Sequence, residues 1–192
     1  PNEAFYEGRL INGIEAADRP APAGLLWNDW EAPIVFLPLK GGEVLSPDGA
    51  SKENPAEAGW IARLLEGLLE AGDLAQKDIG IITPYAGQVR AIRDAIPERY
   101  DSVEVHTVDG YQGREKEVIL FSCVRSNDEG NVGFLADSRR LNVALTRARR
   151  GLIVVGDPDL ALGDMDHFDR GAHIPASRRA SSASRTRVGT ST

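Results

Sequence analysis

Short apolar runs alternate along the chain with segments in which apolar residues recur every three or four positions. Five runs predict β-strands, namely IVFLPL (34–39), IGII (79–82), VEVHTV (103–108), EVILFSCV (117–124) and GLIVVG (151–156). Most of them are continuously apolar and lack the strict alternation of a strand that has one wet face. Such runs favour strands that are buried on both faces of a parallel sheet.

Two segments between the first runs predict amphipathic helices. The first helix has Asn54 as its N-cap, Pro55 at its first helical position and Gly72 after its end. Its apolar stripe consists of Ile61, Leu64, Leu65, Leu68 and Leu69. The second helix follows TPY (83–85) and ends before Pro97. Its apolar face consists of Val89, Ile92 and Ile96.

A third helix is predicted to start at Asp137, a good N-cap, and to extend to about Arg149. Its apolar face consists of Leu141, Ala144, Leu145 and Ala148. Strands that alternate with such helices predict an α/β domain whose mostly parallel sheet is covered by helices on both faces. Binding sites in these sheets gather at the carboxyl ends of the strands. We therefore expect the chemistry in TPY, TVDGYQGRE (107–115) and RSN (125–127), each of which follows a predicted strand.

The chain divides by composition into three parts. Residues 1–32 contain Pro20, Pro22 and Gly24 and have little periodicity, which predicts an irregular segment that docks on the domain. Residues 33–163 form the predicted α/β domain. Residues 164–192 are rich in Ser and Arg and have few large apolar groups, so we expect a disordered tail there.

The overall composition is that of an ordinary globular protein, with 42% apolar and 27% charged residues. The single cysteine, Cys123, cannot form an internal disulfide, and no stretch approaches the roughly 20 apolar residues of a membrane span. We therefore expect an intracellular protein, cytoplasmic or nuclear, with no membrane partner. Because the chain starts at Pro1 and its one methionine is Met165, we also expect it to be a piece of a longer protein.

Five arginines lie within the twelve positions from Arg139 to Arg150, in a chain whose net charge is −7. A guanidinium can hold phosphate oxygens through two parallel hydrogen bonds and stays charged at any working pH. On a helix, Arg140 and Arg147 would point to nearly the same side, about 20° apart, while Arg149 would point elsewhere. Not all five can therefore reach one ligand. The alternative is that most of them lie along a helix surface with their charged heads in water.

A dense polar cluster, VDGYQGREKE (108–117), directly precedes a predicted strand. Gly110 and Gly113 allow tight turns and a close approach of the backbone to a ligand. The cluster adds an amide, a carboxylate and two cations, from Gln112, Glu115, Arg114 and Lys116. A solvated turn explains the same composition equally well, so a binding site and a turn remain alternatives. No cluster of metal ligands surrounds any of the three histidines, and no metal site is predicted.

Three stretches resemble helicase motifs IV, V and VI in their order and spacing. They are TPYAGQ (83–88), TVDGYQGREKE (107–117) with SCVRSN (122–127), and GFLADSRRLNVALTRAR (133–149). The resemblance is to the superfamily 1 helicases, in the branch that contains the nonsense-mediated-decay RNA helicase, senataxin and the immunoglobulin-mu-binding helicase. It includes FYEGRLINGIEAADR (5–19) and covers roughly residues 4–160. It implies the C-terminal, second RecA-like domain of such a helicase, which is a three-layer α/β domain.

The resemblance implies a nucleotide site. Arg147 matches the arginine finger that reaches across the interdomain cleft to the γ-phosphate of ATP, and Glu115 matches the residue that contacts the ribose. Gly113 allows a close approach, with Gln112 and Arg114 beside it in the same site. The other arginines of the cluster are expected to have different roles. Arg140 supports the cleft or the neighbouring loop, whereas Arg139, Arg149 and Arg150 are expected to be surface charge.

The resemblance also implies a nucleic-acid site. The residues that match loops along the nucleic-acid backbone are Thr83, Tyr85 and Thr107. Hydroxyls and main-chain N–H groups in such loops bind phosphates without reading bases. A narrow groove of this kind explains how an acidic domain could hold single-stranded RNA or DNA.

The chain contains no G-x-x-x-x-G-K-[ST] loop and no acidic pair for magnesium. In the family that it resembles, both motifs belong to the N-terminal RecA-like domain, so ATP with Mg²⁺ would bind between that domain and this one. We therefore expect one half of an ATP-dependent helicase or translocase, which alone does not hydrolyse ATP. The alternative is a catalytically inactive, helicase-like scaffold that binds nucleic acid or proteins.

Overall fold

The computed structural model describes residues 16–27 and 33–161, together with Glu7, Arg9, Gly13 and Asp29. Its main element is a five-stranded sheet with the strand order β1-β7-β6-β4-β5, in which every neighbouring pair is parallel. The strands are β1 (Ile34–Pro38), β4 (Ile79–Thr83), β5 (Glu104–Thr107), β6 (Lys116–Ser122) and β7 (Ala148–Gly156). All five predicted strands are confirmed, as is their parallel arrangement.

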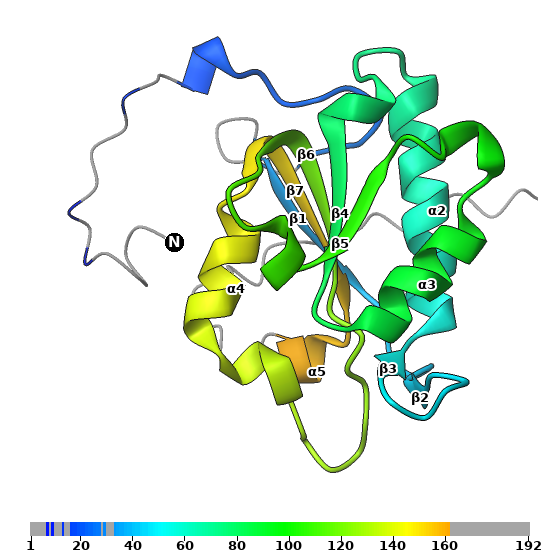
Figure 1. Ribbon diagram of the computed structural model, residues 1–192. Coiled ribbons are helices and arrows are strands. Elements are labelled where there is room, and N and C mark those ends of the chain that lie inside the picture. Colours follow the sequence, from blue (N-terminus) through cyan, green and yellow to red (C-terminus); the bar gives the residue numbers. More distant parts are fainter. Residues whose placement is uncertain are drawn as a thin grey trace, which may run out of the picture.

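Helices cover both faces of the sheet (Figure 1). The helices α2 (Pro55–Glu70) and α3 (Ala86–Ala95) lie on one face, and α4 (Ser138–Leu145) lies on the other. A short hairpin of β2 (Val44–Leu45) and β3 (Lys52–Glu53) precedes α2, and α5 (Pro158–Ala161) follows β7. Short 3-10 helices lie at Ala16–Asp18, Gln76–Asp78, Glu98–Tyr100, Asp109–Tyr111 and Gly133–Ala136. The described residues thus have the three-layer α/β architecture that the sequence predicts.

The apolar core lies on both sides of the sheet, and β6 shows why its sequence does not alternate. Val118 and Leu120 pack on the side of α2 and α3, whereas Ile119 and Phe121 pack on the side of α4. All four side chains are fully buried. Since burying such a side chain contributes roughly 1.5–3 kcal/mol, each position of the strand favours an apolar residue.

The helix α2 begins where its sequence predicts. The Asn54 side chain accepts a hydrogen bond from the Glu57 backbone N–H at 3.1 Å, and Pro55 is the first helical residue. The predicted stripe faces the core, with Ile61, Leu65 and Leu68 buried and Leu64 and Leu69 partly buried against it. The burial of Glu57 in the first turn was not predicted.

The third predicted helix is shorter than expected. Asp137 is its N-cap, but α4 ends at Leu145 and β7 begins at Ala148. The reason is pairing with β6, because the Lys116 backbone N–H donates to the Arg147 carbonyl at 3.1 Å and Lys116 lies opposite Ala148. This pairing overrides the helical periodicity. The expected alignment of Arg147 with Arg140 on one helix face is therefore wrong.

The described part of the N-terminal segment packs against the sheet domain. Trp27 is buried, and its indole N–H donates to the Pro22 carbonyl at 2.6 Å. Arg150 donates to the Pro20 carbonyl and to the Asp73 carboxylate, both at 2.8 Å. Only 16% of the Arg150 side chain is exposed, so the prediction that Arg150 is surface charge is wrong.

The predicted tail at 164–192 lies outside the described residues. No helix in the described part of the chain is long and apolar enough to cross a membrane.

Candidate functional site

Two of the predicted motifs meet at the amino-terminal edge of the sheet. QGRE (112–115) directly precedes β6, and TRAR (146–149) leads into β7, which is the neighbour of β6. The hydrogen bond from Lys116 to the Arg147 carbonyl joins the two segments. The structure thus brings Glu115 and Arg147, predicted from separate motifs, to the starts of adjacent strands.

This location differs from the expectation that all chemistry lies at the carboxyl ends of the strands. The segment after β5 crosses from the carboxyl end of β5 to the amino end of β6, so QGRE reaches the opposite edge. Tyr111 anchors the crossing: its ring is fully buried over β4, where a Cβ on Gly80 would lie 2.0 Å from the Tyr111 hydroxyl. Gly113 then turns the chain with φ +79°, a conformation that favours glycine.

Arg147 bonds to uncharged groups of the end of α4. Its Nε donates to the Val143 carbonyl at 2.9 Å, and its Nη2 donates to the Thr146 hydroxyl at 3.1 Å. No carboxylate among the described residues pairs with it. The two bonds hold the guanidinium at the end of α4 and use two of its five N–H groups. The half-buried Arg147 therefore keeps donors for another anion.

Three other arginines of the cluster are paired with carboxylates. Arg140 lies 3.4 Å from Asp109 and 3.6 Å from Asp137, so it supports the loop before QGRE. Arg149 lies 3.1 Å from Glu115, and Arg150 pairs with Asp73 as described above. The cluster is therefore not one basic patch, and its members act in different places.

The QGRE loop is exposed and rich in ion pairs. The Glu115 carboxylate accepts from Arg149, which also lies 3.7 Å from Glu117. Glu104 accepts from Arg114 at 2.7 Å and from Lys116 at 2.8 Å. The bonds from Lys116 and Arg114 hold the pKa of Glu104 below its usual range. Gln112 and Gly113 are also exposed, so every predicted residue of the nucleotide site lies at the surface of this edge or close to it.

The predicted nucleic-acid residues lie at the opposite, carboxyl edge. Tyr85 follows β4 as the N-cap of α3, and Thr107 is the last residue of β5, where its hydroxyl accepts from the Gly110 N–H at 3.3 Å. Both are half-buried. Thr83 is fully buried, its carbonyl accepts from Val108, and its hydroxyl has no hydrogen-bond partner within the described residues. The structure therefore does not present the Thr83 side chain at the surface.

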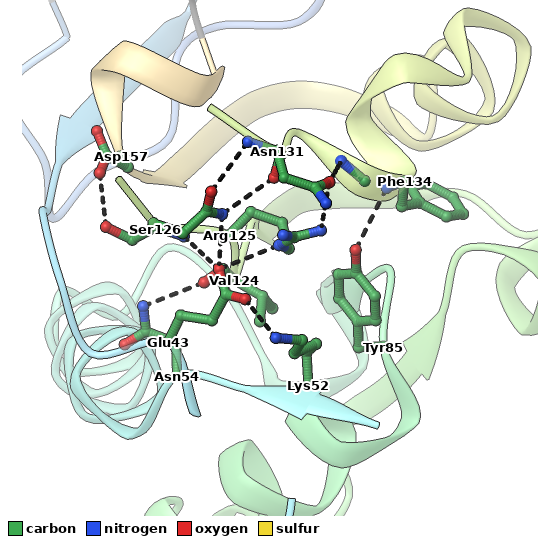
Figure 2. Close-up of polar contacts among 12 residues, drawn as sticks. Glu43, Lys52, Asn54, Tyr85, Val124, Arg125, Ser126, Asn131, Phe134 and Asp157 are labelled. Atoms are coloured by element: carbon green, nitrogen blue, oxygen red, sulfur yellow. Dashed lines mark hydrogen bonds and ion pairs between the residues drawn. The ribbon is translucent and has the colours of Figure 1, made fainter. Parts of the chain in front are cut away.

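A polar cluster that the sequence did not predict lies beside Tyr85 (Figure 2). The Glu43 carboxylate accepts from Arg125 Nε at 3.0 Å and from Lys52 Nζ at 2.8 Å. Burial opposes ionisation of Glu43, but the hydrogen bonds from Lys52, Ser126, Asn127 and Arg125 outweigh it and lower its pKa to about 2. Burial likewise opposes the charge of Arg125, yet hydrogen bonds with Tyr85 and Glu43 raise its pKa. The motif RSN marked this place, but nothing in the sequence pointed to Glu43.

A second cluster joins the start of α2 to the end of β6. The buried Glu57 carboxylate accepts from the Ser122 hydroxyl at 2.6 Å and from the Val124 N–H at 2.9 Å. Burial raises the pKa of Glu57 to about 7 against the opposing effect of these bonds. Val124 has φ +72°, which is strained for a β-branched residue. A glutamate three residues after the N-cap Asn54 is the sequence signal that could have found this cluster.

No group of three His, Cys, Asp or Glu side chains in the described ranges is placed to hold a metal ion.

A parallel sheet between two helical layers, with motif residues at both of its edges, defines a RecA-like α/β domain.

Comparisons with known proteins give the family. A family model described as an AAA domain matches residues 1–159. The chain is 43% identical over 165 residues to the regulator of nonsense transcripts 1 homolog of Drosophila melanogaster, covering 82% of this chain and 14% of that protein. It is 41% identical over 166 residues to the ATP-dependent helicase upf1 of Schizosaccharomyces pombe, covering 82% and 18%. It is 40% identical over 166 residues to the ATP-dependent helicase NAM7 of Saccharomyces cerevisiae, covering 82% and 17%.

The chain therefore belongs to this AAA domain family, within the nonsense-mediated-decay branch of the superfamily 1 helicases. It spans 14% to 18% of the length of these three relatives.

Proposed function

We propose that this chain is the second RecA-like domain of an ATP-dependent helicase or translocase that moves along single-stranded RNA or DNA. The observation that supports the proposal best is the separation of the motif residues. Glu115 and Arg147 lie at the amino edge of the sheet, whereas Tyr85 and Thr107 lie at its carboxyl edge. A rigid parallel sheet between the two edges can link a change at the nucleotide to a change in the grip on a strand. Two of the relatives are named as ATP-dependent helicases, which agrees with this function.

Arg147 is the proposed arginine finger. Its free N–H groups and the absence of a carboxylate partner among the described residues fit a contact with a γ-phosphate held by a neighbouring domain. The bonds to the Val143 carbonyl and the Thr146 hydroxyl already hold the guanidinium, so less of it has to be ordered when the cleft closes. When bound, Mg²⁺ and ATP supply the metal that neutralises phosphate charge and the phosphoryl group that is transferred. The phosphate loop and the Mg²⁺ ligands would belong to the N-terminal RecA-like domain of the same protein.

Glu115 is the proposed ribose contact. Its carboxylate is exposed and can accept hydrogen bonds from ribose hydroxyls, in competition with Arg149, 3.1 Å away. Gly113 has no atom within 4 Å of the place where a Cβ would lie, so the backbone there is open to a ligand. Gln112 and Arg114 line the same loop and can contact the nucleotide with an amide and a cation.

Tyr85 and Thr107 are the proposed strand contacts at the carboxyl edge. Tyr85 offers an aromatic ring on which a base can stack, and such stacking tolerates any base. Thr107 offers a hydroxyl for a phosphate. Thr83, buried below them, would act by shaping the loop.

The test is Arg147→Ala in the complete protein that contains this domain. We expect the nucleic-acid-stimulated ATPase rate to fall by roughly 10³- to 10⁵-fold, the range for arginine fingers, while the affinity for single strands is largely kept. The matched control is Arg139→Ala, because Arg139 is exposed and pairs with no carboxylate among the described residues. Equal ATPase rates in the Arg147→Ala variant and the unaltered protein would show that Arg147 is not the finger.

A further inference from the structure

A buried carboxylate joins two loops at the carboxyl edge of the sheet (Figure 2). Besides Lys52 and Arg125, Glu43 accepts hydrogen bonds from the Ser126 N–H at 2.8 Å and from Asn127 Nδ2 at 3.1 Å. Only 6% of its side chain is exposed. Glu43 precedes β2, and its partners lie on β3 and in the loop after β6. One carboxylate therefore fixes the hairpin and that loop to each other.

Arg125 carries this connection to Tyr85. Its side chain is 8% exposed, and its Nη1 donates to the Asn131 side chain at 3.2 Å. The loop closes directly over it, since a Cβ on Gly133 would lie 2.2 Å from Arg125 Nη1 and 2.6 Å from the Tyr85 hydroxyl. The same hydroxyl accepts from the Phe134 N–H at 3.2 Å. The hydroxyl of Tyr85 is thus held by the loop and lies against the guanidinium.

The arginine of RSN is therefore not a free cation beside a strand site. It is buried, and Glu43 neutralises its charge at 3.0 Å. Because the Arg125 guanidinium is buried and its charge is neutralised, it is poorly placed to bind a phosphate. Its geometry suits a different task, which is to hold Tyr85 and the loop 125–134 in one arrangement.

We propose that Glu43, acting through Arg125, is a positioning residue that fixes Tyr85 and the loop 125–134 for binding of single-stranded nucleic acid. This inference rests on the proposed function of the carboxyl edge. The expected effect of removing Glu43 is opposite to that of its charge alone. A carboxylate close to a polyanion weakens binding through its charge, so its removal should tighten binding unless the carboxylate organises the site.

The experiment is Glu43→Gln in the complete protein, with the affinity for a fluorescent single-stranded oligonucleotide measured by anisotropy at several salt concentrations. We expect affinity to fall roughly 3- to 30-fold, the range for residues that act through others. We expect the slope of log affinity against log salt to stay the same. Each lost phosphate contact would change that slope by about 0.7 on a single strand. Unchanged or tighter binding by Glu43→Gln would overturn the proposal, as would a loss of slope.

A double variant tests the route through Tyr85. Tyr85→Phe removes only the hydroxyl that Phe134 and Arg125 hold, so Glu43→Gln should weaken binding little further in that background. Additive losses would show that Glu43 acts elsewhere. The matched control is Glu98→Gln, which makes the same charge change at an exposed position outside the loop 125–134. We expect no loss of affinity from it.

Asn131→Ala and the strand binding of the unaltered protein provide two further tests. If Glu43→Gln does not fold, Asn131→Ala removes the second anchor of Arg125 without touching the ion pair, and the same loss at constant salt slope is expected. Full affinity in Asn131→Ala would then overturn the proposal. If the unaltered protein binds no single strand, the proposed function fails. If it binds and Glu43→Gln binds equally well, only the positioning role fails.

Discussion

Replacing Glu57 with glutamine should remove a pH dependence from the stability of this domain. The Glu57 carboxylate is fully buried in the first turn of α2 and accepts hydrogen bonds from Ser122 and from the Val124 N–H. Burial raises its pKa from 4.5 to about 7. Glu57→Gln keeps the size of the side chain and one carbonyl oxygen, but it cannot ionise.

The magnitude follows from the difference between the folded and unfolded states. Because the folded pKa is the higher one, the folded state binds the proton more tightly, and this stabilisation is fully present below about pH 4.5. It is lost as the pH rises through about 7, where the buried carboxylate must ionise. At about 1.4 kcal/mol per pKa unit, the change from 4.5 to about 7 corresponds to roughly 3 kcal/mol.

The assay is urea unfolding of the chain and of Glu57→Gln at several values between about pH 4.5 and 8. Other titrating groups, among them His106 and Glu43, are present in both proteins, so the difference in unfolding free energy isolates Glu57. We expect the unaltered chain to lose roughly 3 kcal/mol relative to the variant across this range. A difference that stays constant with pH would contradict this prediction, because it would mean that Glu57 ionises as easily in the folded state as in the unfolded one.

Two further predictions concern stability and are measured by urea unfolding. Gly133→Ala should lower the free energy of unfolding by roughly 2–4 kcal/mol. The backbone there has φ +54°, and the new Cβ would lie 2.2 Å from Nη1 of Arg125. Gly113→Ala, with φ +79° but open space, should cost only about 1 kcal/mol, and equal costs would contradict the close contact. Arg150→Ala should lower the free energy of unfolding by roughly 1–3 kcal/mol, because it removes the pair with Asp73, and it should speed proteolysis within 16–27. If neither the stability nor the proteolysis rate changes, the N-terminal segment docks without Arg150.

The fold could be predicted from the sequence because it depends on patterns that extend over many residues. The continuous apolar run at 117–124 identified a strand buried on both faces, and Asn54 with Pro55 identified the start of α2. The end of α4 could not be predicted in the same way. The apolar spacing at 141–148 fits one long helix as well as it fits a helix followed by a strand. Only the pairing of Ala148 with β6 determines that the strand begins there.

The candidate site could be predicted only in part, because its residues come together through topology. Motif resemblance marked Glu115 and Arg147, but not that they would lie on the edge opposite to Tyr85. Glu43 has no motif of its own: it becomes important only when the loop after β6 folds over Arg125. Thr83 shows the converse, since its place in a motif did not reveal that its side chain is fully buried.

In the proposed function, the nucleotide and the nucleic-acid strand bind to opposite edges of one sheet. Hydrogen exchange of the complete protein tests it most directly, with a non-hydrolysable ATP analogue and a single-stranded oligonucleotide added separately. We expect the analogue to protect amides near 112–115 and 146–148, and the oligonucleotide to protect amides near 85–88 and 107–110. Protection of one and the same edge by both ligands, or of the edges in the reverse order, would contradict it.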